Sequence, residues 1–281
     1  MGFYIEKQSD IITSRSNPLL IKLCKLRDKK HRENEALFCL DGIKLLLEAA
    51  EYGADIIRYI LVREDAISKV TSALNKSFEG REKRTNGTLV LLSESAFDKL
   101  SEEKSPEGVI TVVDYLSERH RKMDVCNEGS FVGTEKTLML ESVRDPGNLG
   151  ALMRSAAAFG VERIIMSADC ADVYNPKALR AAMGAIFKVS TDKVKSLENA
   201  IKQLKKQGRR VFATTLAERS QRLGDIELGD TDVFIVGNEG HGLSCAVIDE
   251  AGESIYIPMC EGTESLNAAI AASVCMWEMR K

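Results

Sequence analysis

The 281-residue sequence predicts an α/β fold built as two domains. Two observations indicate this class. Helical patterns mix with short β-rich apolar runs in the N-terminal part, whereas strands alternate regularly with helices in the C-terminal part. Between them lies a polar stretch without periodicity, which is typical of an interdomain linker. The sequence therefore predicts a smaller N-terminal α/β domain at residues 1–116, a linker at 117–136 and a C-terminal domain at 137–281.

The N-terminal domain is expected to begin with a helix. Leu19, Leu23 and Leu26 form one apolar stripe over residues 17–30, lysines lie on the opposite face, and Asn17 is expected to cap the helix. The other elements expected here are a helix over 40–54, strands over 56–62, 88–93 and 108–113, and a charged surface loop over 75–87.

The same region carries a concentration of positive charge. Seven cations and one anion, Asp28, lie between Arg15 and Arg32, although the whole chain has a net charge of −3. Such a cluster can neutralise nucleic-acid phosphates without reading sequence. It can equally be the solvated face of a helix, and the charges alone do not separate these interpretations.

The C-terminal domain shows a regular alternation of elements. Strands are expected over 137–142, 162–167, 209–216, 232–239 and 254–259, and helices over 148–160, 175–187, 196–207 and 265–279. Strands separated by full helical segments indicate βαβ crossovers, and hence a parallel sheet covered by helices on both faces.

Composition excludes several classes of protein. Apolar residues at 44% and charged residues at 29% are typical of a globular protein. The sequence lacks both a run of about 18 apolar residues and a signal-type start, so we expect a cytoplasmic protein that does not contact a membrane. The seven cysteines are scattered and the three histidines lie far apart in sequence, so we expect reduced thiols and no metal.

Three polar, glycine-rich segments follow predicted strands: VRDPGNLGALMR, NEGHGLS and CEGTESLN. Because parallel sheets bind ligands at the carboxyl ends of their strands, these segments predict a polar site. NEGHGLS, with the glycine before it, matches a dinucleotide fingerprint only loosely, which disfavours a dehydrogenase. In the first segment Asn148 is expected to cap a helix that Gly160 ends, which leaves Arg154 unexplained, as a long cation among alanines.

Taken together and in this order, DPGNLGALMR, FIVGNEGHGLS and YIPMCEGTESLNAAIAAS resemble the SpoU (TrmH-type) branch of the SPOUT methyltransferases. The segments SRSNPLLIKLCKLRDKKHRENEALFCLDGIKLLLEAA and SPEGVITVV look like the substrate-binding domain of that family, which is similar to ribosomal protein L30e. The resemblance implies a C-terminal SPOUT domain with a trefoil knot, S-adenosyl-L-methionine as cofactor, and methyl transfer to a ribose 2′-hydroxyl of RNA.

The resemblance also implies which residues carry the reaction. The catalytic positions it implies are Asn148, Arg154, Glu239, Ser265 and Asn267. A guanidinium with a pKa above about 12 is a reluctant base, so we interpret Arg154 as a group that holds an RNA phosphate and stabilises the developing alkoxide. The alternative is an ion pair with Glu141, Asp145 or Glu239. Asn148, Ser265 and Asn267 could also serve as helix caps.

For the cofactor, the family positions matched are Gly237, Ile257 and Leu266, with Thr215 and Met259 as expected neighbours. An adenine ring needs apolar walls and a few main-chain hydrogen bonds, which suits these residue types, although Ile257 and Leu266 could equally be core. The family's last helix contributes to dimerisation, so the resemblance implies a homodimer. Met276 and Trp277 are candidate interface anchors, with plain burial as the alternative.

With this resemblance, the basic cluster is interpreted as an RNA-binding surface. The expected phosphate contacts are Arg15, Lys22, Lys29, Lys30 and Arg32. The N-terminal domain resembles ribosomal-RNA members more than transfer-RNA members, so ribosomal RNA is the expected partner. The alternatives are a tRNA 2′-O-methyltransferase and a non-catalytic RNA-binding or ribosome-assembly factor that keeps the fold.

Overall fold

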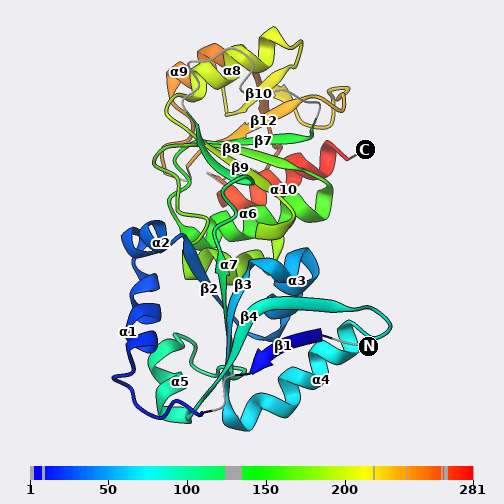
Figure 1. Cartoon of the computed structure of the whole chain (residues 1–281). Helices are drawn as coiled ribbons and strands as arrows, with labels where there is room; N and C mark the ends of the chain where they lie inside the picture. The colour runs from blue at the N-terminus through cyan, green and yellow to red at the C-terminus, as the bar shows by residue number, and fades with distance from the viewer. Residues whose placement is uncertain are drawn as a thin grey trace. The chain divides into compact units, whose positions relative to one another are not determined.

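The computed structural model describes residues 3–7, 10–123, 135–217, 219–238, 240–260, 262 and 265–280. The chain forms two compact units (Figure 1). Unit 1 comprises Met1–Tyr115 with Tyr174–Phe187, and unit 2 comprises Leu116–Val173 with Lys188–Lys281. A short segment from the C-terminal half of the sequence thus belongs to the N-terminal unit. The sequence pattern gave no sign of this exchange.

Unit 1 contains a five-stranded mixed sheet with strand order β1-β4-β3-β5-β2. Its strands are β1 (Phe3–Lys7), β2 (Leu37–Asp41), β3 (Ile57–Arg63), β4 (Lys83–Leu92) and β5 (Val109–Asp114). Its helices are α1 (Pro18–Cys24), α2 (Lys29–Glu35), α3 (Ile43–Gly53), α4 (Ile67–Ser77), α5 (Glu94–Leu100) and α7 (Pro176–Ala182). The neighbours of β4 are parallel to it, and β5 is antiparallel to both of its neighbours.

Helices α1 and α5 cover one face of this sheet and α3 and α4 the other (Figure 1). The apolar stripe expected from the sequence packs this part of the chain onto the sheet and α5. Leu23 and Leu26 are buried with Leu20 against Leu61 and Phe97. Complete burial of such a side chain contributes about 1.5–3 kcal/mol. The apolar spacing of the sequence therefore fixes which side of α1 meets the sheet.

The segment around α7 is held in unit 1 mainly by aromatic contacts. Tyr174 stacks on Tyr115 with ring centroids 3.9 Å apart and lies 4.8 Å from the ring of Phe38. Phe187 lies 5.2 Å from the ring of Tyr52. Offset aromatic pairs of this kind add about 0.5–1.5 kcal/mol each beyond their buried area. Unit 1 consequently takes part of its core from residues far away in sequence.

Unit 2 contains an eight-stranded sheet with order β11-β13-β10-β12-β7-β8-β9-β6, and every pairing in it is parallel. Its strands are β6 (His120–Met123), β7 (Thr137–Leu140), β8 (Arg163–Ser167), β9 (Ser190–Val194), β10 (Val211–Thr214), β11 (Gln221–Arg222), β12 (Val233–Val236) and β13 (Glu253–Tyr256). Its helices are α6 (Pro146–Phe159), α8 (Leu197–Lys206), α9 (Cys245–Ala251) and α10 (Ala268–Glu278). The predicted parallel sheet is confirmed.

Two helix layers sandwich this sheet, as the alternation of strands and helices predicts (Figure 1). Helices α8 and α9 pack on one face, where Met139, Ile165 and Ile235 are completely buried. Helices α6 and α10 pack together on the other face. Both sides of the sheet are therefore apolar at these three residues, and polar loops follow at the strand ends.

Some sequence predictions need correction. The expected helix over 17–30 is broken, because Asp28 has an extended backbone and caps a separate helix, α2. The expected surface loop over 75–87 ends early, because β4 begins at Lys83 and pairs with the edge strand β1. Within the expected linker, His120–Met123 forms β6, and residues 124–134 lie outside the described residues.

Two kinds of feature are absent from the described residues. No helix in those ranges is long and apolar enough to cross a bilayer. Likewise, the described part of the chain holds no group of three or more His, Cys, Asp or Glu side chains placed to bind a metal ion.

Candidate active site

A cavity of about 250 Å³ opens where strands β10, β12 and β13 end. Because all three strands are parallel, the loops that leave them meet at one edge of the sheet. The five predicted cofactor residues all lie in its wall: Thr215, Gly237, Ile257, Met259 and Leu266. Ser265, predicted as catalytic, lines the same cavity. The fold thus brings together residues that span about fifty positions of the sequence.

The wall of this cavity is largely apolar side chains and backbone. At Gly237 the chain turns so tightly that a Cβ atom would lie 2.4 Å from the carbonyl carbon of Gly242. Gly242 has a φ of +65° and donates its N–H to the carbonyl of Asn238 at 2.9 Å. Such a turn leaves peptide groups close to a ligand, which fits a flat aromatic ring held by main-chain groups. The residues present therefore fit an adenosyl group.

The first turn of α6 differs from the prediction. Asp145, not Asn148, caps the helix, and its side chain accepts a hydrogen bond from the Asn148 N–H at 2.9 Å. Asn148 therefore lies inside the helix, where its side chain is not needed as a cap. Its Oδ1 accepts a hydrogen bond at 3.1 Å from Nδ2 of Asn267, the residue that caps α10. Two predicted catalytic residues that lie 119 positions apart in the sequence are thus in direct contact.

Arg154 lies six residues after Asn148 on α6 and is exposed. The ion pair considered from the sequence is not formed with any residue that the structure describes. Glu141 accepts hydrogen bonds from the N–H and hydroxyl of Ser244, at 2.8 and 2.7 Å, and Asp145 caps α6. Glu239 lies outside the described residues. The guanidinium of Arg154 is therefore available to a ligand.

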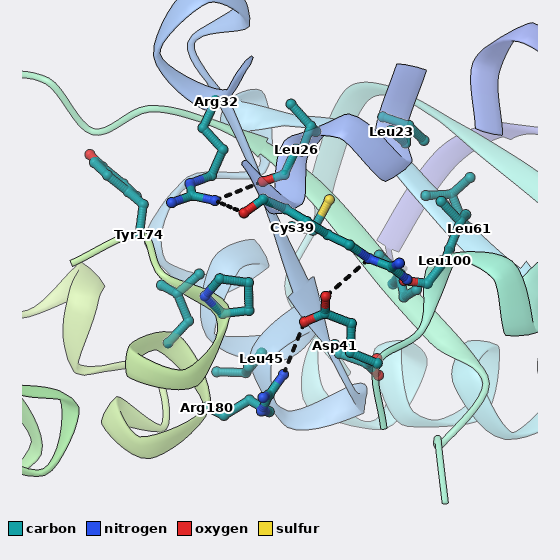
Figure 2. Close-up of a pocket in the computed structure, with 15 residues that line it drawn as sticks. Leu23, Leu26, Arg32, Cys39, Asp41, Leu45, Leu61, Leu100, Tyr174 and Arg180 are labelled. Carbon is teal, nitrogen blue, oxygen red and sulfur yellow. Dashed lines mark hydrogen bonds and ion pairs between the residues drawn. The ribbon is translucent and has the colours of Figure 1, made fainter. Parts of the chain in front are cut away.

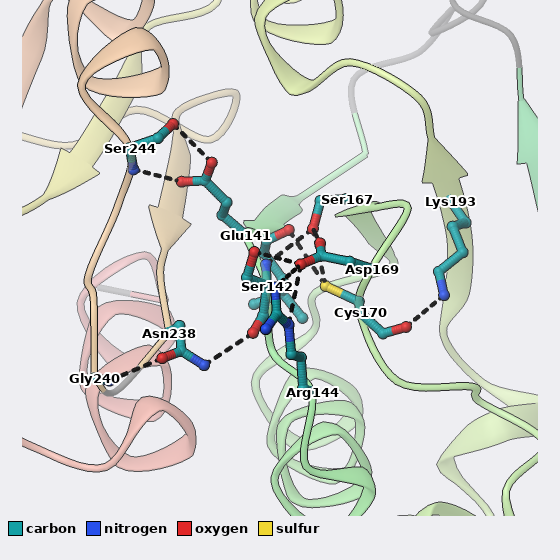
Figure 3. Close-up of polar contacts among 11 residues, drawn as sticks. Glu141, Ser142, Arg144, Ser167, Asp169, Cys170, Lys193, Asn238, Gly240 and Ser244 are labelled. Carbon is teal, nitrogen blue, oxygen red and sulfur yellow. Dashed lines mark hydrogen bonds and ion pairs between the residues drawn. The ribbon is translucent and has the colours of Figure 1, made fainter.

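A second polar cluster lies beside the site, at the ends of β7 and β8 (Figure 3). The carboxylate of Asp169 accepts hydrogen bonds from the hydroxyls of Ser142 and Ser167, at 2.7 and 2.6 Å, and from Arg144 Nη2 at 2.7 Å. Partial burial raises the pKa of Asp169, but these donors outweigh burial and hold the pKa well below its usual range. Asp169 is therefore a carboxylate at every physiological pH.

Sequence reasoning missed this cluster. The available signal was the same one that located the main site, since Asp169 follows strand β8 closely. The segment has no glycine and belongs to none of the family motifs quoted above, so nothing drew attention to it. It becomes visible only when the parallel register places the ends of β7 and β8 side by side.

The predicted phosphate contacts of unit 1 fall into three groups. Arg15, Lys29 and Lys30 are exposed. Lys22 is also exposed but forms an ion pair with Glu35 at 2.6 Å, and this hydrogen bond raises the pKa of Lys22. Arg32 is a correction: its side chain is only 2% exposed and Nη1 donates to the carbonyls of residues 26 and 27. A buried guanidinium committed to the backbone does not meet phosphate.

Unit 1 contains a smaller cavity, of about 50 Å³ (Figure 2). Its wall includes Leu45, Cys39 and Tyr174, and at one side Glu102 lies between Arg27 and Arg180, with an N–O distance of 3.0 Å to the former and 3.9 Å to the latter. Burial raises the pKa of the Cys39 thiol to about 12, so this sulfur is not a nucleophile at neutral pH. The cavity is too small for a cofactor.

With this geometry in place, comparison with known proteins identifies the class. Residues 135–277 match the SpoU rRNA methylase family, and residues 17–111 match the MRM3-like substrate-binding domain. The chain belongs to the SpoU rRNA methylase family. The predicted family resemblance and two-part α/β fold are confirmed.

Particular relatives cover nearly the whole chain. RlmP of Bacillus subtilis, a 23S rRNA (guanosine(2553)-2′-O)-methyltransferase, is 28% identical over 96% of this chain and 98% of its own. A tRNA/rRNA methyltransferase of Synechocystis is 30% identical over 97% and 95%. The AdoMet-bound rRNA methyltransferase of Sinorhizobium meliloti superposes with a TM-score of 0.77 at 28% identity, over 96% and 97%.

Proposed function

We propose that this protein transfers a methyl group from S-adenosylmethionine to a ribose 2′-hydroxyl of RNA, and that the RNA is ribosomal. The proposal rests on one observation: a cavity formed partly by backbone lies beside polar side chains that the sequence predicts to be catalytic. Ser265 lines that cavity, and Asn267, two residues further along the chain, contacts Asn148 of α6. The 2′-O-methyltransferase activity named for the Bacillus subtilis relative supports the reaction.

On the cofactor side, S-adenosylmethionine supplies an electrophilic methyl group when bound. The chain's own contribution is to hold that group and to exclude water. Ile257, Met259 and Leu266 offer apolar surface to the adenosyl group, and the turn at Gly237 brings peptide groups close to it. The same loops, between β12 and α10, are where we place the trefoil knot that the family resemblance implies.

On the RNA side, a ribose hydroxyl must lose its proton as it attacks in line. We assign to the exposed guanidinium of Arg154 the roles of holding the adjacent phosphate and stabilising the developing alkoxide. The hydrogen bond from Asn267 holds the side chain of Asn148 at the first turn of α10. With the alkoxide stabilised in this way, the hydroxyl proton passes to solvent water while the C–O bond forms and the methyl–sulfur bond breaks, so no strong base is needed from the protein.

Two further features of the proposal concern assembly and the RNA surface. We propose a cytoplasmic homodimer formed through α10, where Ile270 is 55% and Trp277 47% exposed. Met276 is completely buried within unit 2 and is not an interface anchor. In unit 1 we assign Arg15, Lys29 and Lys30 to RNA phosphates, with Lys22 shared with Glu35.

The test is transfer of tritiated methyl groups to unmodified ribosomal and transfer RNA by the wild type, Arg154→Ala and Lys202→Ala. Lys202, on α8, is an exposed cation paired with Glu250 of α9, so its loss controls for charge. Label is expected in ribosomal RNA, in alkali-resistant dinucleotides, reduced about 10²–10³-fold by Arg154→Ala alone. Label in a base would contradict the ribose assignment, label only in transfer RNA would support the tRNA alternative, and cofactor binding without transfer to either RNA would support the non-catalytic factor.

A further inference from the structure

Ser142, at the end of β7, has a φ of +56°, a conformation that non-glycine residues rarely adopt. Four interactions surround it. Its N–H donates to Oγ of Ser167 at 2.9 Å, and its hydroxyl donates to Oδ2 of Asp169 at 2.7 Å. The Ser167 hydroxyl donates to Oδ1 of Asp169 at 2.6 Å. The fourth interaction reaches the cofactor cavity. Strained backbone of this kind persists where its surroundings hold it in place, and here Asp169 is the centre that holds it.

The carbonyl of Ser142 is the link to the cofactor cavity (Figure 3). It accepts a hydrogen bond at 3.0 Å from Nδ2 of Asn238. The other end of the same amide, Oδ1, accepts the N–H of Gly240 at 2.8 Å. Asn238 lines the cavity and directly follows Gly237. A rotation of the peptide after Ser142 would therefore be transmitted to the turn that forms the cavity wall.

Arg144 is the exposed member of the cluster. Its Nε and Nη2 lie 3.2 and 2.7 Å from Oδ2 of Asp169, and 67% of its side chain is exposed. One edge of the guanidinium is thus anchored, and the described residues provide no partner for Nη1. Arg144 directly precedes Asp145, the cap of α6, so it lies at the end of the helix that carries Asn148. A guanidinium held in this way is preorganised to bind a phosphate oxygen.

Resting on the function proposed above, we propose that Asp169 is a positioning residue with two tasks at this site. It holds Ser142 in the conformation that fixes the Asn238 turn of the cofactor cavity, and it presents Arg144 to the phosphates of the RNA substrate. Arg144 is then an RNA-binding residue outside the basic cluster of unit 1. Asp169 touches neither ligand and acts through these neighbours.

Four variants separate the two tasks. Arg144→Ala removes only the phosphate contact, so we expect about tenfold weaker RNA binding with unchanged cofactor affinity. The slope of log K against log salt should fall by nearly one, as the loss of one phosphate contact requires. Arg144→Lys keeps the charge and should restore most of that slope. Asn238→Ala should weaken cofactor binding with no change in the salt dependence of RNA binding. Asp169→Asn should weaken both.

The control is Lys202→Ala, which removes a cation of similar exposure, 57%, from α8. All variants are measured by RNA anisotropy over a salt series and by calorimetry with S-adenosylmethionine, after melting curves have established folding. If Asp169→Asn does not fold, Ser142→Ala replaces it, because alanine is as strained at positive φ as serine but loses the hydroxyl bond to Asp169. Ser142→Ala should weaken cofactor binding, with Arg144 still paired.

Two results would overturn the inference. One is an Arg144→Ala protein with the RNA affinity and salt slope of Lys202→Ala. The other is unchanged cofactor affinity in a folded Asp169→Asn or Ser142→Ala protein. Methyl transfer by the wild type is measured in parallel, so that failure of the proposed reaction is distinguished from failure of this inference: in the first case the wild type transfers no label, whereas in the second it transfers label while the binding differences are missing.

Discussion

Two cavities, one from each unit, are built in opposite ways. In unit 1, side chains enclose a cavity of about 50 Å³, and Glu102 lies at one side between Arg27 and Arg180. In unit 2, about 250 Å³ lies between strand-end loops, and glycine backbone forms the tightest turn. Side chains can rotate to fill space, whereas a turn fixed by glycines cannot. From this comparison we propose that the first cavity is imperfect packing and the second is a preformed ligand site.

The largest expected effect tests the backbone-built cavity. Gly237→Ala places a Cβ 2.4 Å from the backbone of Gly242, so the turn must move. We expect cofactor binding to be lost by at least a hundredfold, measured by calorimetry. Gly229→Ala is the matched control, because its Cβ would meet only the carboxylate oxygens of Asp232, at 3.8 and 4.0 Å. Equal cofactor affinity in the two variants would mean that the turn does not shape the site.

The side-chain-built region is tested by Tyr174→Ala. This side chain is 5% exposed and stacks on Tyr115 in the wall of the smaller cavity. Its removal should lower the free energy of unfolding by about 3 kcal/mol, as for other buried aromatic residues. Tyr174→Phe keeps the ring and should cost under about 1.5 kcal/mol. Denaturant unfolding measures both, and cofactor affinity in unit 2 should stay unchanged in each. A coincident loss of cofactor binding would show that the two cavities are not independent.

A smaller effect separates structure from chemistry at α10. Asn267 caps this helix through Oδ1 and donates to Asn148 through Nδ2. Asn267→Asp keeps the acceptor and loses the donor, so stability should be preserved while methyl transfer falls about tenfold. Asn267→Ala loses both groups and should also destabilise the protein by about 1 kcal/mol. If Asn267→Asp transfers methyl groups at the wild-type rate, the contact with Asn148 has no part in the reaction.

The contrast also explains which features were predictable from sequence. The parallel sheet and its helices follow from apolar periodicity, and a polar site at the strand ends follows from glycines after strands, signals that are local in sequence. The residues of the cofactor wall were implied by the family resemblance. The Asp145 cap, the burial of Arg32 and the Asp169 cluster were missed. Each depends on which residues tertiary packing brings together, as with Arg32 folding back on the turn before α2. The membership of Tyr174 in unit 1 was missed for the same reason.

The smallest expected effect is on the pH dependence of stability, and it concerns two aspartates, one from each unit. Burial raises the pKa of Asp41, partly offset by the hydrogen bond from Ser101, whereas the pKa of Asp169 is lowered. A raised carboxyl pKa means that the folded state holds its proton more tightly than the unfolded chain, so Asp41 costs stability as the pH rises past about 4. A lowered pKa has the opposite sign: Asp169 contributes stability at neutral pH, and that contribution is lost as the pH falls below about 4 through the folded pKa.

The two substitutions should therefore show opposite pH dependence. Asp41→Asn keeps the acceptor for Ser101, so at pH 7 it should be more stable than the wild type, by less than about 1 kcal/mol, and equal to it near pH 3. Asp169→Asn should be less stable at pH 7 by about 1 kcal/mol, because the side chain is partly exposed, with the difference shrinking in acid. Urea unfolding across pH 3–8 measures both curves. If the stability differences of the two variants change with pH in the same direction, the two carboxylates lie in similar electrostatic environments. The two units would then differ in how their cavities are built but not in how they shift a carboxyl pKa.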